Sequence, residues 1–337
     1  MRILLDGMGG DYAPAVVVEG AVEALPIVPH EIVILGDQEQ IQRELEKYKG
    51  DLQRISIVHT TETITNDEPP VKAVRTKTDS SIVRGMNMVK AGEGDLFISA
   101  GSTGALMAAG LFILHRITGI DRPAIASIYP ILGGGFSLLV DAGANAECRA
   151  SNLLEFACMG SIYMERVMGV MDPSIGLVNI GAEAQKGTAT IKETHGLLTS
   201  SKLNFIGNVE AREIPAGVCD VIVADGFVGN VILKLTEGLA LNILSTVKKK
   251  FTSDVVAKMG ALLLKGKLME LKEEFDYSEY GGAPLLGIRG PVIKMHGSSN
   301  GKAVKNSIIK AVPFMEENVV GLIESAIENL KEMNIAD

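Results

Sequence analysis

Residues 3–14 read ILLDGMGGDYAP, and this stretch decides the fold class. Its apolar run is typical of a buried strand, and its glycines allow backbone angles that other residues resist. Pro14 suits the first turn of a helix, because a residue there needs no backbone N–H. The stretch therefore predicts a strand, a tight turn and a helix, in that order.

The same stretch imitates a dinucleotide-binding turn. The fingerprint G-x-G-x-x-G is matched by Gly7 and Gly9, but its third glycine is replaced by Tyr12. Asp6 and Asp11 flank the turn, and their carboxylates would repel a pyrophosphate unless a metal intervened. The sequence therefore disfavours a nicotinamide dehydrogenase, and we expect no cofactor.

Short β-like runs alternate with helix-length segments through the first two thirds of the chain. This alternation predicts a mainly parallel sheet with helices on both faces, as one α/β domain over residues 1–337, with ligands at the carboxyl ends of the strands. The expected strands are 2–6, 31–36, 55–59, 95–100, 124–129, 136–141, 174–180, 203–207 and 220–225. Glycine-rich stretches fall at 7–11, 100–105, 141–145, 179–187, 225–230 and 296–301.

From Gly226 to about residue 275 the pattern becomes helical and apolar. We expect Gly260 and Gly266 to break it into two shorter helices. A broad apolar stripe opposes the lysines of this segment. It comprises Val255, Met259, Leu262, Leu263 and Met269. Such a stripe fits either contact with a lipid interface or a buried interface between two copies, and the candidate contacts are Val255, Met259, Leu262, Leu263 and Leu264. A last amphipathic helix is expected at about 316–333.

Composition excludes several classes of protein. The formal charge is −9, tryptophan is absent and aromatic residues make up 4%, which disfavours a nucleic-acid partner. Cys148, Cys158 and Cys219 form no C-x-x-C motif, so we expect neither a disulfide framework nor a metal site, and a reducing cytosol is the simplest location. We expect no signal peptide and no membrane-spanning helix.

The AGSTGA stretch places Gly101, Ser102 and Thr103 where a strand gives way to a helix. Free backbone N–H groups and the positive end of the helix dipole favour an anion there. The alternative is an ordinary turn in which a hydroxyl caps the helix.

Three further candidates follow strands in the second half of the chain. Lys186 lies in NIGAEAQKG, where it would neutralise a phosphate or an oxyanion, or would simply be a solvated surface lysine. Asp225 and Asn230 bracket DGFVGN, where the Asn amide would donate to an oxyanion and the Asp would orient a donor. The alternative role of Asp225 and Asn230 is structural, as a turn residue and a helix N-cap.

His296 is the histidine inside a Gly/Ser loop, HGSSNG, where it would pass a proton near neutral pH. Cys148 is disfavoured as a nucleophile because its loop is acidic and no histidine is near it in sequence. Anion-friendly turns without an activated Ser or Cys indicate binding of a small phosphate species.

Taken in order, these loops resemble those of the acyl-acyl carrier protein:phosphate acyltransferases of bacterial phospholipid synthesis, the PlsX family. The resemblance extends from Leu4 to Ser299. It rests on ILLDGMGGDYAP, SAGSTGA, DAGAN, LVNIGAEAQKG, FIGNVEAREIP, DVIVADGFVGNVILKLTEG and YGGAPLLGIRG followed by HGSS.

The resemblance implies transfer of a long-chain fatty acyl group from acyl carrier protein to inorganic phosphate, giving acyl phosphate without a nucleotide. It also implies a fold similar to isocitrate/isopropylmalate dehydrogenases and phosphotransacetylases. Lys186 would hold the phosphate or the oxyanion, Asn230 would support the oxyanion or position the carbonyl, and Asp225 would orient the loop. His296 would protonate the leaving thiolate. The implied phosphate or pantetheine contacts are Gly101, Ser102, Thr103, Asn145, Ser298 and Ser299.

The resemblance further implies that residues 240–275 form a protruding helical pair for dimerisation and peripheral membrane attachment. It implies a cytoplasmic homodimer held at the inner face of the membrane, beside the downstream glycerol-3-phosphate acyltransferase. Two basic clusters are candidate docking surfaces for the acidic acyl carrier protein. One comprises Lys72, Arg75, Lys77 and Arg84, and the other Lys248, Lys249 and Lys250. The alternatives are a phosphotransacetylase-like enzyme that uses acyl-coenzyme A and a non-catalytic protein that binds acyl carrier or a lipid surface.

Overall fold

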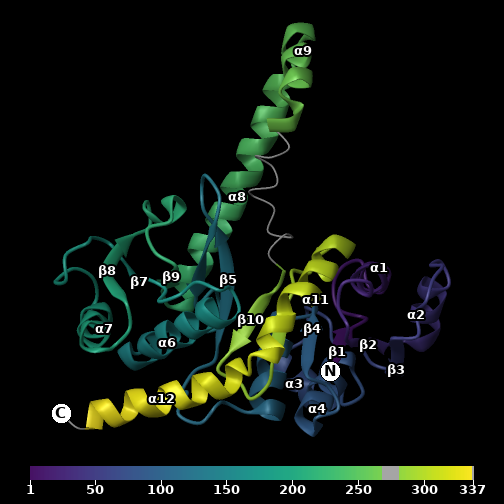
Figure 1. Cartoon of the computed structure of the whole chain (residues 1–337), viewed down its shortest axis with the longest axis horizontal. Helices are drawn as coiled ribbons and strands as arrows, with labels where there is room; N and C mark the ends of the chain where they lie inside the picture. The colour runs from purple at the N-terminus through teal and green to yellow at the C-terminus, as the bar shows by residue number, and fades with distance from the viewer. Residues whose placement is uncertain (268–280, 336–337) are drawn as a thin grey trace. The chain divides into compact units, whose positions relative to one another are not determined.

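Figure 1 presents the computed structural model of the chain, which describes residues 1–267 and 281–335. The chain divides into two compact units. Unit 1 comprises residues 1–127, 158–172 and 278–337, and unit 2 comprises residues 128–157 and 173–277. The expectation of one domain over the whole chain stays a prediction, and residues 268–275 of the expected helical pair lie outside the described residues.

The strands of unit 1 follow the order β3-β2-β1-β4-β11-β10-β5. They are β1 (Arg2–Asp6), β2 (Glu31–Gly36), β3 (Ile55–His59), β4 (Leu96–Ser99), β5 (Ala124–Pro130), β10 (Ala283–Leu286) and β11 (Val292–Lys294), with β5 ending in unit 2. The strands from β3 to β11 pair in parallel, whereas β10 is antiparallel to both its neighbours. The apolar run of β1 is fully buried, which explains its near-continuous hydrophobicity.

Glycines let the helices of unit 1 approach closely. The helices are α1 (Ala15–Ala24), α2 (Gln38–Leu45), α3 (Pro70–Thr76), α4 (Ser81–Ala91), α5 (Thr103–Ala109), the π-helix η1 (Gly110–Leu114), α11 (Gly301–Glu316) and α12 (Val319–Ile335). A Cβ at Gly20 of α1 would lie 2.4 Å from the Val304 Cβ of α11, and one at Gly85 of α4 would lie 2.3 Å from the Phe97 ring of β4. Side chains larger than hydrogen are therefore excluded at both contacts.

Unit 2 holds a second parallel set of strands in the order β6-β9-β7-β8. They are β6 (Phe136–Val140), β7 (Ile175–Asn179), β8 (Phe205–Glu210) and β9 (Val221–Val223). The helices are α7 (Ala189–Ser200), the 3-10 helix η2 (Ile214–Ala216), α8 (Gly226–Phe251) and α9 (Val255–Leu263), while α6 (Ala150–Arg166) crosses between the units.

The predicted strands are confirmed with small changes at their ends, and the first helix begins directly after Pro14, its N-cap residue. Strands β10 and β11 and helix α11 were not predicted, because Gly and Pro interrupt the short runs at 283–294 and the polar residues of 300–310 mask the periodicity. The predicted last helix corresponds to α12.

Helix α8 begins beside the strands of its own unit and extends away from them toward α9, as Figure 1 shows. The predicted break at Gly260 is wrong, because Gly260 lies inside α9. The chain instead leaves the helix between α8 and α9, where Asp254 accepts a hydrogen bond from the Ala257 N–H and caps α9. By length and composition alone α8 is long and apolar enough to cross a membrane, with a mean hydropathy of 1.4 over an 18-residue window, and the expectation of no spanning helix stays a prediction.

We predict opposite effects from two glycine substitutions in α8. A Cβ at Gly229 would lie 1.9 Å from the Asp141 carbonyl oxygen, so Gly229→Ala should lower the free energy of unfolding by roughly 3 kcal/mol. Gly238 has open space around its Cβ position, so the matched Gly238→Ala variant should gain about 0.5–1 kcal/mol. Urea unfolding measures both, and equal stabilities of the Gly229→Ala variant and the wild type would contradict the packing.

Candidate functional site

Three loops of unit 2 lie at one edge of its strands. Strands β6, β9 and β7 are parallel neighbours, so their carboxyl ends meet at the same edge. The loops that follow them contain residues 141–145, 225–230 and 179–187, respectively. The structure therefore brings Asn145, Asp225, Asn230 and Lys186 to one edge, as the sequence predicts.

The loop after β6 is built around the carboxylate of Asp141, which is fully buried. This carboxylate accepts hydrogen bonds from the backbone N–H groups of Gly143, Ala144 and Asn145, and from the Asn145 side-chain amide at 2.9 Å. These hydrogen bonds from its own loop satisfy the buried carboxylate and hold the loop in one turn. Sequence reasoning missed Asp141; its signal is an Asp directly after a buried strand and before a glycine-rich turn.

The start of α8 is tied to this loop. Gly226 donates its N–H to the Asn145 carbonyl at 2.7 Å, and the Asn230 side-chain amide donates to the Ala142 carbonyl at 3.2 Å. Asp225 caps α8 by accepting from the Val228 N–H at 2.8 Å. The N-cap interpretation of Asp225 is thus confirmed, and Asn145 has a structural task in its loop.

Asn230 is nevertheless exposed, and an amide nitrogen carries two hydrogens. One of them points to Ala142, which fixes the orientation of the side chain. The second N–H bond of the same nitrogen can donate to a ligand oxygen without any change of rotamer.

Lys186 lies in a loop whose backbone is held at several points. Its N–H donates to the Glu183 carbonyl, its own carbonyl accepts from the Asn179 amide, and the Asn208 amide binds the Glu183 carbonyl. Gly187, at φ 89°, has its Cβ position 2.4 Å from the Asn179 Oδ1 atom, so the turn requires glycine. The lysine itself is exposed, on a fixed turn beside the loop of Asn230.

Unit 1 repeats this arrangement with different loops. Strands β1, β4 and β11 are parallel neighbours, and the loops at their carboxyl ends contain residues 7–11, 100–105 and 296–301. The Asp11 N–H donates to the Gly297 carbonyl at 2.8 Å, which joins the first and third loops directly. The structure thus gathers Gly101, Ser102, Thr103, His296, Ser298 and Ser299 at one edge of unit 1.

Asp6 is the buried centre of this second set. Its carboxylate accepts from the Ser99 hydroxyl at 2.6 Å and from the Met8 N–H at 3.1 Å, and the Ser99 hydroxyl accepts from the Gly101 N–H. Burial raises the pKa of Asp6, and side-chain hydrogen bonds from Ser81 and Ser99 act against that rise. The Gly101 N–H is therefore engaged within the protein, so phosphate contact through that group is not supported.

Ser102 and Thr103 begin α5. The Ser102 hydroxyl accepts from the Ala105 N–H at 3.4 Å and is buried, so its role as a helix cap is confirmed. The hydroxyl hydrogen of Ser102 can still donate a hydrogen bond to another acceptor. Thr103 is exposed, and a phosphate contact through either residue stays a prediction.

The loop after β11 orients His296. The His296 Nδ1 atom lies 2.8 Å from the Ser298 hydroxyl and accepts from the Ser298 N–H at 3.2 Å. His296 and Ser298 are exposed, whereas Ser299 is buried and donates its N–H to the His296 carbonyl. Proton transfer by His296 stays a prediction, and the Nε2 atom is the one that would perform it.

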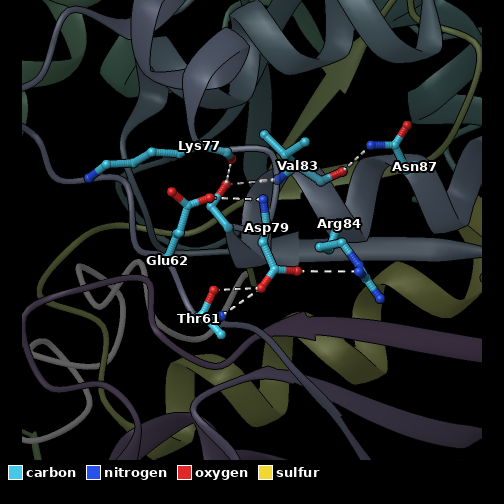
Figure 2. Close-up of polar contacts among 8 residues, drawn as sticks. Thr61, Glu62, Lys77, Asp79, Val83, Arg84 and Asn87 are labelled. Carbon is cyan, nitrogen blue, oxygen red and sulfur yellow. Dashed lines mark hydrogen bonds and ion pairs between the residues drawn. The ribbon is translucent and has the colours of Figure 1, made fainter.

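The first basic cluster is largely paired with acidic groups. Figure 2 shows Asp79 accepting from Thr61 and from Arg84, while the Asp79 N–H donates to Glu62. Lys77 binds Glu68 at 2.7 Å, and the pKa values of Asp79 and Glu68 are lowered chiefly by hydrogen bonds from Thr61 and from Lys77, respectively. Lys248, Lys249 and Lys250, at the end of α8, are all exposed.

The unit 2 edge suits stabilisation of a negatively charged oxygen. It offers a cationic Lys186 and the amide of Asn230, on segments held in place by hydrogen bonds. Cys148, in the same loop as Asn145, donates its thiol hydrogen to the Asn145 carbonyl at 3.7 Å.

Comparisons with known proteins agree with this chemistry. Residues 1–322 match the model of the family described as fatty acid synthesis protein. The chain is 53% identical to a phosphate acyltransferase of Alkaliphilus oremlandii, over 98% of both proteins. It is 48% identical to a phosphate acyltransferase of Clostridioides difficile, over 99% of this chain and 98% of the relative.

The fold is also similar to that of solved phosphotransacetylases. A phosphotransacetylase from Streptococcus pyogenes superposes with a TM-score of 0.63 over 94% of each chain, although only 18% of residues are identical. This likeness confirms the predicted α/β fold, while the sequence matches decide the family. The chain belongs to the fatty acid synthesis protein family, the PlsX family that its loops resemble.

Proposed function

We propose that this protein is an acyltransferase of phospholipid synthesis that moves a long-chain fatty acyl group from acyl carrier protein to inorganic phosphate. The proposal rests on the edge of unit 2, where Lys186 in the loop after β7 and Asn230 near the start of α8 follow the neighbouring strands β7 and β9. The names of the relatives, phosphate acyltransferase, support the acyl acceptor.

In the proposed reaction a phosphate oxygen attacks the thioester carbonyl carbon. A C–O bond forms, the carbonyl oxygen becomes an oxyanion, and the C–S bond then breaks to release the pantetheine thiolate. Lys186 neutralises the phosphate or the oxyanion, and the free amide hydrogen of Asn230 donates to the carbonyl oxygen. Asp225 holds the start of α8, and His296 is the proposed proton donor to the thiolate.

The attacking phosphate takes the place of an enzyme nucleophile, so no residue is acylated. Such a reaction needs groups that bind phosphate and stabilise an oxyanion, as Lys186 and Asn230 would do, and needs no covalent intermediate on the enzyme. A phosphotransacetylase-like use of coenzyme A thioesters is the second candidate, favoured by the fold of the Streptococcus pyogenes enzyme.

We predict phosphate-dependent release of free thiol from palmitoyl-acyl carrier protein, with little release from palmitoyl-coenzyme A. The Lys186→Ala variant should lose about 100- to 1,000-fold in turnover, the usual effect of removing an oxyanion donor. A thiol-reactive dye measures the rates.

Lys192→Ala is the matched control, because Lys192 is an exposed lysine of α7 a short distance along the chain, and its turnover should match the wild type. Near-normal turnover by folded Lys186→Ala would remove that residue from the mechanism. Preference for coenzyme A would favour the second candidate, and release from neither donor would favour a binding protein.

We also propose that the carrier protein docks on Lys248, Lys249 and Lys250. Carrier protein is acidic, and a local positive surface must attract it to this acidic chain. The first basic cluster is the weaker candidate, since Lys77 and Arg84 already bind Glu68 and Asp79.

We predict that Lys248→Glu/Lys249→Glu lowers kcat/KM for palmitoyl-acyl carrier protein about tenfold at low salt, because steering slows, and that high salt removes the difference. Lys72→Glu, an exposed lysine of the first cluster, is the control and should change kcat/KM little. The reverse pattern, with the loss confined to Lys72→Glu, would assign docking to the first cluster.

We propose that α9 makes peripheral contact with the inner face of the cytoplasmic membrane and that the chain works as a homodimer. No residue of α9 is buried, and Leu263 is 87% exposed. Large exposed apolar surface of this kind is found at lipid or protein interfaces. Lys258 and Lys265 supply positive charge for anionic headgroups. Contact with the downstream glycerol-3-phosphate acyltransferase belongs to the same proposal.

We predict that Leu263→Glu lowers co-sedimentation with vesicles that contain anionic lipid at least severalfold, since it places a charge in the apolar face. Met171→Glu, a change at another exposed apolar residue outside α9, is the control and should bind like the wild type. Gel filtration checks the dimer. Unchanged lipid binding with a lost dimer would assign Leu263 to the interface between copies.

A further inference from the structure

Asn208 of β8 holds the turn that carries Lys186. Its side-chain amide donates to the Glu183 carbonyl at 3.0 Å, and the Lys186 N–H donates to the same carbonyl oxygen at 3.0 Å. One oxygen atom therefore joins the backbone of Lys186 to a side chain of another strand. Asn208 lies 25 residues beyond Glu183 along the chain, so the contact exists only in the folded protein.

The other end of the Lys186 residue is held by Asn179, the last residue of β7. The Asn179 amide donates to the Lys186 carbonyl at 3.1 Å, and the Asn179 Oδ1 atom accepts from the Ile180 N–H at 2.8 Å. The N–H and the carbonyl of Lys186 are thus both tied to neighbouring strands. A backbone fixed at both ends fixes the direction in which the Lys186 side chain leaves the turn.

A β-bulge directs Asn208 to this turn. The register between β7 and β8 shifts by one residue at Ile206, so that Asn208 pairs with Leu177 instead of Val178. Side chains alternate between the two faces of a sheet, and paired residues share a face. The shift therefore puts Asn208 on the same face as Leu177 and Asn179. In an unshifted strand it would point to the opposite face, away from Asn179.

Gly207 provides the backbone conformation that the bulge needs. Its φ of 108° lies in the left-handed region, which favours glycine. A Cβ at this position would meet nothing within 4 Å, so the preference for glycine comes from the backbone angle and not from crowding. Strand β8 thus departs from regular geometry directly before Asn208.

The stability of the fold gives no reason for an asparagine at this position. Asn208 is 8% exposed, and its Oδ1 atom is buried and accepts no hydrogen bond from the described residues. Burial of an amide oxygen without a donor destabilises a protein. A leucine of similar shape would avoid this effect, and the Glu183 carbonyl would keep its hydrogen bond from the Lys186 N–H.

We propose that Asn208 is a positioning residue for the acyl transfer, which fixes the turn of Lys186 so that the ammonium group meets the negative charge of the reaction. This inference rests on the proposed function of Lys186 and names a residue that supports it. A charged donor held in place before the reaction stabilises a developing charge better than one that must reorganise. Asn208 itself is buried and acts through Lys186.

The Asn208→Leu variant tests the proposal in the assay of thiol release from palmitoyl-acyl carrier protein. We expect kcat to fall roughly 10- to 100-fold, the effect of moving a catalytic group by up to about 1 Å. KM for the carrier-protein donor should stay near the wild-type value. The urea midpoint of unfolding should stay the same or rise, because the buried amide oxygen without a donor is gone.

A double-mutant cycle shows whether Asn208 acts through Lys186. In a Lys186→Ala background, Asn208→Leu should change kcat by about twofold or less, because the group that it positions is absent. Thr194→Val is the matched control. Thr194 is a fully buried residue of α7 whose hydroxyl donates to the Thr190 carbonyl at 2.8 Å, so this change also removes one buried bond to a carbonyl and should leave kcat unchanged.

A normal kcat in folded Asn208→Leu would overturn the proposal, and so would an equal loss of kcat with and without Lys186. A lower urea midpoint with normal kcat would make Asn208 a purely structural residue. Asn208→Val also lacks a donor and suits a strand, so it repeats the test if Asn208→Leu does not fold. Near-normal turnover of Lys186→Ala, or no thiol release by the wild type, would refute the proposed function itself and this inference with it.

Discussion

The buried carboxylate of Asp141 is the interaction on which the unit 2 site depends. It accepts hydrogen bonds from the N–H groups of residues 143–145 and so holds them in one turn. The carbonyl groups of the same loop bind Gly226 and Asn230 at the start of α8. A buried carboxylate is tolerable only when several donors satisfy it. The donors here belong to the loop itself, so the hydrogen bonds that offset the cost of burying the Asp141 carboxylate also fix the conformation of that loop.

Unit 1 uses the same device with a different carboxylate. Asp6 follows the buried strand β1 and, through the Ser99 hydroxyl, holds the Gly101 N–H of the next loop. In both units the loops that carry exposed polar groups are therefore fixed from beneath by groups that never meet a ligand. A site that stabilises an oxyanion needs this arrangement, since donors that reorganise during the reaction contribute less.

Helix α8 connects the chemistry with the apolar surface. Its first turn is joined to the loops of unit 2, its middle carries exposed apolar side chains and its end carries three lysines. The close approach of the first turn requires the glycines at 226 and 229, because side chains there would collide with the backbone and carboxylate of Asp141 and with the backbone of Asn145. One helix thus carries a donor amide, exposed apolar side chains and a positively charged end.

The sequence by itself determined the alternation of strands and helices, the family, and the loops at the strand ends, because buried strands, glycine turns and helix caps are written in local patterns. It did not reveal β10 and β11, whose short runs become strands only beside β4 and β5. Tertiary structure also decided that Asn145 and the Gly101 N–H serve their own loops and that Lys77 and Arg84 are paired. The physical reason is that a polar group can bind a ligand only if its hydrogen bonds are not already made within the protein. Which partners it meets depends on neighbours that folding brings within hydrogen-bond distance, and many of these lie far along the chain.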